Sequence, residues 1–214
     1  MTAMHADVMR RLYKADIWTG FNPTGTAGEV QGWNGHHPAL GTLAQSAAVV
    51  VDVGVWKGQS TITLGNGMKS AGINGCVIAV DTFLGSTEHW HEKLFDRRHG
   101  HPDLYQTFLS NVWHAGLSEY VVPVAQTSFN AAKILARSGV RANVIHIDAA
   151  HEYEEVIRDI TDYWTILAPG GVLICDDYHE SWPGVVKAAG EFSCKTGMPL
   201  AVDGPKCFIK KPAA

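Results

Sequence analysis

Apolar and polar positions along this chain form blocks that predict strands and helices in turn. Short, nearly continuous apolar runs rich in Val and Ile are typical of strands buried on both faces of a parallel sheet. Runs of this kind occupy 47–54, 75–81, 120–124, 140–148 and 172–176. Stretches with helical spacing follow them, at 60–70, 103–115, 128–138, 153–167 and 185–195.

The order of these elements predicts the fold. Strands that alternate with helices build right-handed βαβ units around a parallel sheet. Residues 200–210 read instead as two strands that turn at Asp203-Gly204-Pro205, which indicates an antiparallel hairpin at one edge. We therefore expect an α/β protein with a Rossmann-like, doubly wound, mostly parallel seven-stranded sheet and helices on both faces.

Two short helices, at 3–14 and 38–47, are expected before the first strand. Between them, 19–37 is a long segment rich in Gly, Asn, Thr and Pro, and such loops are usually functional or disordered. We expect one domain over residues 1–214, with a helical or lid-like extension at 1–46 and a catalytic core at 47–214.

Composition narrows the class of protein without naming a function. With 214 residues, 46% of them hydrophobic and 18% charged, the chain can bury a full core. A net charge of -4 and scattered basic residues do not favour a nucleic-acid partner. No stretch approaches the ~20 apolar residues of a membrane span, so no membrane partner is expected. The four cysteines are far apart and suit a reducing cytoplasm.

Carboxylates end two of the predicted strands. Asp148 ends the run at 140–148, and Asp176 and Asp177 end the next one. In parallel sheets ligands bind outside the carboxyl ends of the strands. Three carboxylates gathered there repel one another unless a cation joins them or one is protonated, and a hard cation such as Mg²⁺ prefers oxygen ligands. Because successive strand residues point to opposite faces, Asp176 and Asp177 converge only if the strand has already ended.

The first strand leads into a glycine-bearing turn and a helix. Gly54 and Gly58 would let the backbone approach a ligand, although a tight turn needs glycine for structural reasons alone. Asp52 lies inside the strand, where a carboxylate is costly to bury without a partner. A ligand that carries a cation and an amine would supply one. Asp81 ends the second strand and could accept hydrogen bonds from ribose hydroxyls or merely cap the strand.

Four segments, taken in order, resemble class I S-adenosylmethionine-dependent methyltransferases, and more narrowly the metal-dependent sugar O-methyltransferases that act on macrolide and aminocoumarin glycosides. The resemblance spans about residues 30–195. The segments are Asp52-Val-Gly54-Val-Trp56-Lys57-Gly58, Asp81-Thr-Phe-Leu-Gly-Ser-Thr-Glu-His-Trp90, Ile147-Asp-Ala-Ala-His-Glu-Tyr153 and Asp176-Asp177-Tyr178.

The resemblance implies where S-adenosylmethionine binds. The first motif and its turn face the methionine portion, Asp81 and its neighbours hold the ribose, and a segment after the third strand borders the adenine. The cofactor contacts implied in this way are Asp52, Gly54, Trp56, Lys57, Gly58, Ser60, Asp81, Thr82, Phe83, Gln126, Thr127, Ser128 and Asp148.

The resemblance also implies the catalytic groups. Asp148, Asp176 and Asp177 correspond to the metal ligands, with Mg²⁺ or a similar cation, and Asp148 and His151 are the catalytic residues. His151 corresponds to the general base of some members, since a neutral imidazole can take a proton from a hydroxyl. Asp148 and His179 are competing bases, and His151 could instead only cap the next helix.

Two departures from the family pattern stand out. Trp56 replaces the usual second glycine of the first motif, as is common in this branch. Ala149-Ala150 follows the first metal aspartate, where many relatives have Gly-Asp or Gly-Ser, so a carboxylate base at 150 is absent. His146, inside a strand, is expected to be a satisfied core histidine.

The sequence thus predicts transfer of a methyl group from S-adenosylmethionine to a hydroxyl of a sugar or other small molecule. A metal-dependent hydrolase or hydroxylase-like enzyme and a non-catalytic nucleoside-binding module are the alternatives, and a homo-oligomer is left open. The loops at 19–37 and 84–102 should contact the acceptor. Candidate pocket-wall residues are Trp33, His36, His37, Trp90, Arg98 and Trp182.

Overall fold

A single mixed sheet runs through the protein and places the site residues at the carboxyl ends of its parallel strands. The computed structural model describes residues 1–25 and 30–213, so residues 26–29 of the 19–37 loop lie outside the described residues. The seven strands follow the order β5-β2-β1-β6-β7-β9-β8. The first five run parallel, and β9 pairs antiparallel with both β7 and β8. The predicted fold class is therefore confirmed.

The strands of the sheet are β1 (Val49–Val53), β2 (Cys76–Asp81), β5 (Val121–Ala125), β6 (Ala142–Ile147), β7 (Leu167–Cys175), β8 (Leu200–Asp203) and β9 (Lys206–Lys210). The helices are α1 (Ala3–Tyr13), α2 (Pro38–Ala44), α3 (Gln59–Ser70), α4 (Leu104–His114), α5 (Ser128–Arg137), α6 (Tyr153–Ile166) and α7 (Pro183–Thr196). A separate two-stranded ribbon consists of β3 (Arg97–Arg98) and β4 (His101–Pro102).

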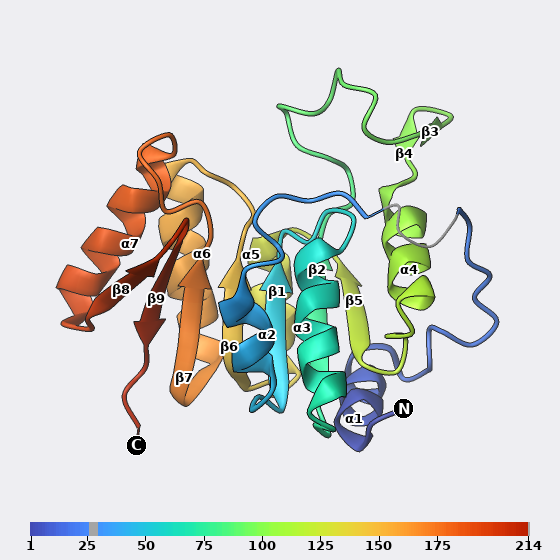
Figure 1. Cartoon of the computed structure of the whole chain (residues 1–214), viewed down its shortest axis with the longest axis horizontal. Coiled ribbons are helices and arrows are strands. Elements are labelled where there is room, and N and C mark those ends of the chain that lie inside the picture. Colours follow the sequence, from blue (N-terminus) through green and yellow to red (C-terminus); the bar gives the residue numbers. More distant parts are fainter. Residues whose placement is uncertain (26–29, 214) are drawn as a thin grey trace.

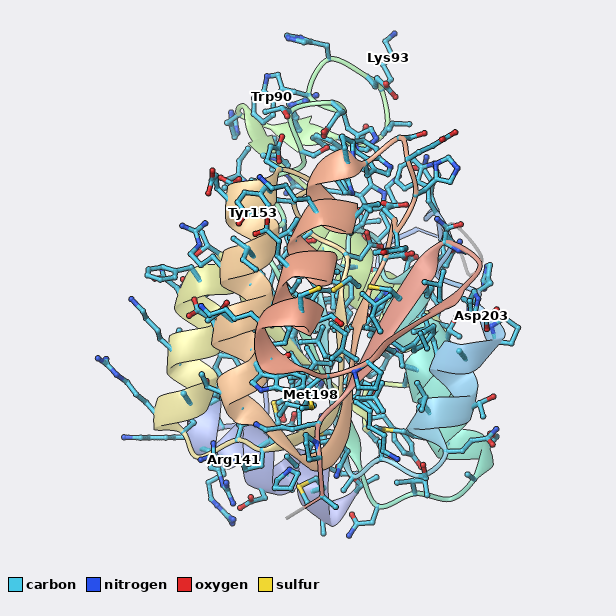
Figure 2. The ribbon with its side chains drawn as sticks, turned by 90° about the vertical axis from the view of Figure 1, so that its left-hand side faces the viewer. Trp90, Lys93, Arg141, Tyr153, Met198 and Asp203 are labelled. Carbon is cyan, nitrogen blue, oxygen red and sulfur yellow. The ribbon has the colours of Figure 1, made fainter. Side chains whose placement is uncertain are left out.

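Helices cover both faces of the sheet, as the near-continuous apolar strands require. In Figure 1, α2 and α3 lie in front of the sheet and α5 and α6 behind it. Figure 2 shows the same two layers from the side, with α7 next to α6. All five residues of β1 and the first five of β2 are buried, so their apolar side chains form the centre of the core.

The carboxyl ends of β1, β2, β6 and β7 share the upper edge in Figure 1. The loop that carries β3 and β4 projects above this edge, and the segment before α2 crosses it. Both chain termini lie at the opposite end. The edge that the sequence predicts to bind ligands is thus the one that the long loops cover.

Two details differ from the sequence-based expectations. Strand β7 begins at Leu167, directly after α6, whereas we expected the strand to begin at 172 after a Pro-Gly-Gly loop. The ribbon of β3 and β4 was not expected, because the polar connection before α4 has no apolar alternation.

Candidate active site

Gly54 brings the ends of β1 and β6 into contact. It has a φ of +83°, and a Cβ atom built on it would lie 1.7 Å from the carbonyl oxygen of Asp148. Any side chain would therefore push the two strand ends apart. Gly54 is needed for this close approach of two backbones, which also fixes Asp148 beside the turn that follows β1.

Asp52 is fully buried and has partners within the protein. Its Oδ2 accepts hydrogen bonds from the hydroxyl groups of Ser60 (2.8 Å) and Thr61 (2.6 Å) at the start of α3. Its Oδ1 lies 2.8 Å from Nδ1 of His146, the neighbouring residue in the β1–β6 register. Two hydroxyls and an imidazole thus already act as partners of Asp52 within the protein, and its contact with the cofactor stays a prediction. His146 is a satisfied core histidine, as expected.

The same buried layer continues to β7 and β9. Lys206, fully buried on β9, forms an ion pair with Oδ2 of Asp176, and its Nζ lies 3.2 Å from Nε2 of His146. Burial raises the pKa of Asp176, but hydrogen bonding to His146 and the positive charges of His146 and Lys206 outweigh burial and lower that pKa to about 2. Asp176 is therefore ionised and already paired with a cation.

Asp148 follows β6 and belongs to two groups of residues that could bind a metal ion. His146, Asp148 and Asp176 form one group, and Asp148, His151 and Asp177 form the other, with the ligand atoms of each within 4.8 Å of one another. Within 1–25 and 30–213, no such group contains all three predicted metal ligands together. Burial, and then the charge of Asp176, raise the pKa of Asp148 to about 8. Binding a cation would relieve this repulsion.

Asp176 and Asp177 contact different partners, Lys206 and His151, although β7 already ends at Cys175. Asp177 has a left-handed φ of 56°, which turns its side chain toward His151. Oδ2 of Asp177 lies 3.0 Å from Nε2 of His151, and Oδ1 accepts a 3.4 Å hydrogen bond from Asn34. The ring of His151 stacks on Trp182 with centroids 3.9 Å apart. His151 is thus held in one orientation by a carboxylate and an aromatic ring.

His151 does not act only as a helix cap. The N-cap residue of α6 is Glu152, and no side-chain hydrogen bond caps that helix. Burial lowers the pKa of His151, but the hydrogen bond to Asp177 and the charges of Asp177 and Asp148 raise it overall. His179, the competing base, is exposed, and its Nδ1 lies 3.0 Å from the hydroxyl of Ser181.

Asp81 organises the turn after β1 through its carboxylate. Oδ2 accepts from the backbone N–H of Trp56 (2.9 Å), and Oδ1 accepts from that of Phe83 (2.7 Å). Both donors belong to residues with left-handed φ, 51° and 56°, a rare conformation for aromatic side chains. Since each carboxylate oxygen can accept a second hydrogen bond, Asp81 still offers acceptors to a ribose. The Phe83 side chain is buried against Tyr105 and Phe108.

Polar side chains of the segment expected beside the adenine form hydrogen bonds within the protein. Thr127 caps α5 by accepting from the backbone N–H of Asn130, and Gln126 accepts from the same residue's side chain. Ser128 donates to Asp159 of α6 at 2.7 Å. Gln126 and Thr127 are exposed at the carboxyl end of β5. Their contacts with adenine, like the rest of the cofactor set, stay predictions.

Two loops meet over the turn at Trp56. Trp33 stacks on His89 with centroids 5.0 Å apart, and both rings pack against Trp56, at 6.2 and 5.1 Å. Lys57 bonds to Gln31 (3.2 Å) and to the carbonyl of Leu94, so its side chain ties the same two loops together. Sequence reasoning placed Lys57 at the methionine portion and did not foresee this link.

A small cavity remains under these loops. It measures about 30 Å³ and reaches from the turn after β1 to Asp148. Its lining residues are Gly32, Trp33, Gly35, Gly54, Val55, Trp56, Gln59, Ser60 and Asp148. Small-molecule pockets typically hold roughly 300–1,000 Å³, so this cavity is smaller than a nucleoside requires. Within the described residues, the buried indole Nε1 of Trp56 has no hydrogen-bond partner, which leaves a donor for a ligand at this turn.

A larger, open cavity of about 340 Å³ lies in the projecting loop and is lined by Gly85, Ser86, Thr87, Trp90 and His91. Figure 2 shows Trp90 in this loop, above the upper edge of the sheet. The charge of Glu88, in the same loop, contributes to raising the pKa of His151, so the loop lies near the catalytic edge. Two other candidate pocket-wall residues do not line this cavity: His37 caps α2, and Arg98 lies 3.4 Å from Asp103.

Residues 51–178 match the family described as "Methyltransferase domain", and the chain belongs to this family. The match contains the end of β1, its turn, Asp81, Asp148, His151 and the Asp176–Asp177 pair. It confirms the predicted class, an S-adenosylmethionine-dependent methyltransferase, over the hydrolase-like and non-catalytic alternatives. No curated protein sequence matches the chain.

Solved structures of O-methyltransferases share the fold. The O-methyltransferase NovP is 19% identical with a TM-score of 0.62, over 84% of this chain and 78% of NovP. The O-methyltransferase from Bacillus cereus, in complex with SAH, is 16% identical with a TM-score of 0.58, over 96% and 91%. CalS11, a TDP-rhamnose 3'-O-methyltransferase, is 17% identical with a TM-score of 0.56, over 80% and 76%. At these identities the likeness establishes the class I methyltransferase fold.

Outside the site, two observations bear on the remaining expectations. None of the helices in residues 1–25 and 30–213 has the length and apolar character needed to cross a membrane. The four cysteines are unpaired.

Proposed function

We propose that this protein transfers a methyl group from S-adenosylmethionine to a hydroxyl group of a sugar or a similar small molecule, with the help of a divalent cation such as Mg²⁺. One observation carries the proposal. The cavity that starts at the glycine turn after β1 reaches Asp148, so the expected cofactor motif and one of the proposed metal ligands open into the same space.

The chain's own residues suit the two halves of the reaction. Asp81 would hold the ribose, and the turn from Gly54 to Gly58, together with Ser60, would border the methionine portion. Asp148 and Asp177 offer oxygen ligands to a cation, which would lower the pKa of a hydroxyl that it binds. Asp52 positions the end of this turn because it accepts a hydrogen bond from the hydroxyl of Ser60.

His151 is the proposed general base. With Nε2 directed at the carboxylate of Asp177, Nδ1 is the nitrogen that can accept a proton. The acceptor hydroxyl loses its proton to His151, and its oxygen forms a bond to the methyl carbon. The bond between that carbon and sulfur breaks, which leaves S-adenosylhomocysteine. Asp177 and Trp182 orient the imidazole and so act as positioning residues.

The acceptor class is proposed from the open cavity of the projecting loop. Its wall includes the exposed indole of Trp90, and flat aromatic faces suit sugar rings. The TDP-rhamnose methyltransferase among the structural neighbours supports a sugar. A cytoplasmic location is also proposed, since cysteines that form no disulfide suit a reducing compartment.

The test is transfer of a labelled methyl group from S-adenosylmethionine to a panel of sugars, nucleotide sugars and phenols, with Mg²⁺ or with EDTA. We expect product with a sugar or nucleotide sugar rather than with the phenols, loss of activity in EDTA, and recovery when metal is restored. His151→Ala should lower kcat by about 10²–10⁴-fold. His179→Ala is the matched control and should stay near wild type. Full activity in EDTA would refute the metal requirement. Loss of activity in His179→Ala but not in His151→Ala would assign the general base to His179.

A further inference from the structure

Lys206 is a buried cation that the methyltransferase chemistry proposed above does not use. The β7–β9 register pairs Cys175 with Cys207, so the next residues along the antiparallel pair, Asp176 and Lys206, lie opposite each other. Lys206 is 0% exposed and Asp176 is 3% exposed. A lysine is almost never buried this completely unless it is paired.

The Lys206 ammonium holds two members of one candidate ligand group. It forms an ion pair with Asp176 and lies 3.2 Å from His146, and both residues belong to the group that Asp148 completes. The other oxygen of Asp176, Oδ1, accepts a 2.9 Å hydrogen bond from the backbone N–H of Asp177. Both oxygens of Asp176 therefore have partners, and one of those partners is a positive charge.

Asp177 has a different environment. It is partly exposed, and its oxygens contact Asn34 and His151, which are neutral or titratable groups. With Asp148 and His151 it forms the second ligand group, and the charge of Lys206 acts on the Asp148 carboxyl of that group without an ion pair to Asp177. A divalent cation next to Asp176 would meet the Lys206 ammonium within a few ångströms, whereas one at Asp148 and Asp177 would lie against oxygen ligands.

We infer that the Lys206 ammonium takes the place of a metal ion at Asp176, so that a divalent cation in this chain is held by Asp148 and Asp177 without Asp176. The part of this inference that places a divalent cation at Asp148 and Asp177 rests on the proposed metal dependence. It departs from the arrangement that the resemblance implied, in which Asp148, Asp176 and Asp177 are all ligands.

The charges of the buried layer support this assignment. Lys206 already gives Asp176 a positive partner, and Asp52 accepts hydrogen bonds from Ser60, Thr61 and His146. A dication added next to Asp176 would therefore lie close to the Lys206 ammonium, at a carboxylate that is already paired. In the second group, by contrast, no lysine ammonium of the described residues forms an ion pair with Asp148 or Asp177.

The test measures binding of Mn²⁺ by electron paramagnetic resonance and calorimetry, in the presence of S-adenosylhomocysteine, for the wild type and four variants. Asp177→Asn should weaken binding about tenfold or more, the loss expected when a metal site is disrupted. Lys206→Met frees Asp176 and should tighten binding about tenfold, because it removes a nearby positive charge. The double variant Lys206→Met/Asp176→Asn keeps the net charge and should bind Mn²⁺ within about threefold of wild type.

The double variant is decisive, because it removes Asp176 without leaving a buried charge unpaired. Weakening as severe as in Asp177→Asn would show that Asp176 is a ligand and would overturn the inference, as would unchanged affinity in Lys206→Met. Asp176→Asn is included to measure the cost of stranding Lys206, and urea unfolding checks that each variant folds.

Failure of the proposed metal dependence gives a different result. If the wild type binds no Mn²⁺ but Lys206→Met does, the ammonium has replaced the metal altogether; the inference about Lys206 then stands and the proposed metal requirement fails. If neither binds Mn²⁺, both are overturned.

Discussion

Gly54→Ala should destabilise the protein far more than an alanine at a glycine with the same backbone conformation and free space. Gly54 and Gly72 both have positive φ, +83° and +63°, so both substitutions incur the left-handed strain of roughly 1–2 kcal/mol. A Cβ at Gly72 meets nothing within 4 Å. A Cβ at Gly54 meets the carbonyl oxygen of Asp148 at 1.7 Å, and real Cβ contacts are essentially never shorter than 3.0 Å.

The structure sets the size of the expected difference. The oxygen of Asp148 must move by more than 1 Å, and it belongs to backbone rather than to a flexible side chain. Overpacking of this kind typically adds about 1–3 kcal/mol. We therefore expect Gly72→Ala to lose about 1–2 kcal/mol and Gly54→Ala about 2–5 kcal/mol. Because the displaced residue is Asp148, activity should fall by about 10²-fold in Gly54→Ala only.

The assay is urea unfolding of the wild type and both variants, with stability taken from the midpoint at a constant slope. Thermal unfolding should agree, since roughly 2–4 °C corresponds to 1 kcal/mol for a chain of this length. If the two variants lose the same stability, the close contact between Gly54 and Asp148 does not constrain the site. Equal loss of activity in both would refute the link from this contact to catalysis.

Two further predictions concern stability and access to the site. Burial raises the pKa of Asp159, which is 1% exposed, from 3.8 to about 6, so its contribution to stability is present below about pH 4 and is lost as pH rises through 6. Asp159→Asn should therefore stabilise the protein by up to roughly 3 kcal/mol at pH 8 and by little at pH 4 in urea unfolding, and an equal effect at both pH values would refute this. Trp33→Ala should open the loops over the small cavity and speed association of S-adenosylhomocysteine in surface plasmon resonance, whereas Trp113→Ala, on the distant cluster with Trp18 and Phe21, should not. A slower or unchanged rate in Trp33→Ala would show that these loops do not limit entry.

The fold could be predicted because its signals are local. The apolar runs and the helices between them are each visible within about ten residues, and the turn at Asp203-Gly204-Pro205 marks the hairpin. The start of β7 was misjudged because Pro169 and the following glycines usually end regular structure, whereas here Leu167 already pairs with Ala142. A register shift between Ala142 and Val144 accommodates this early start, and no sequence pattern announces it.

The site was only partly predictable because some of its contacts join distant strands. Lys206 begins a strand in which it shares one face with Phe208 and Lys210, and lysines in a strand are typical of an exposed edge. Its burial depends on Asp176 and His146, which are 30 and 60 residues away in the chain. One partner of Asp52, His146, is also distant in the chain. The other two, Ser60 and Thr61, follow eight and nine residues later at the start of α3 and were a usable local signal.

Binding of S-adenosylhomocysteine in the presence of EDTA tests the central claim most directly. Calorimetry should show one molecule bound per chain without metal. Asp81→Asn should weaken that binding by about 10–150-fold, the equivalent of one hydrogen bond to a charged group, and urea unfolding checks that the variant is folded at the assay temperature. Absence of binding by the wild type, or full affinity in a folded Asp81→Asn variant, would contradict a cofactor site at the carboxyl ends of β1 and β2.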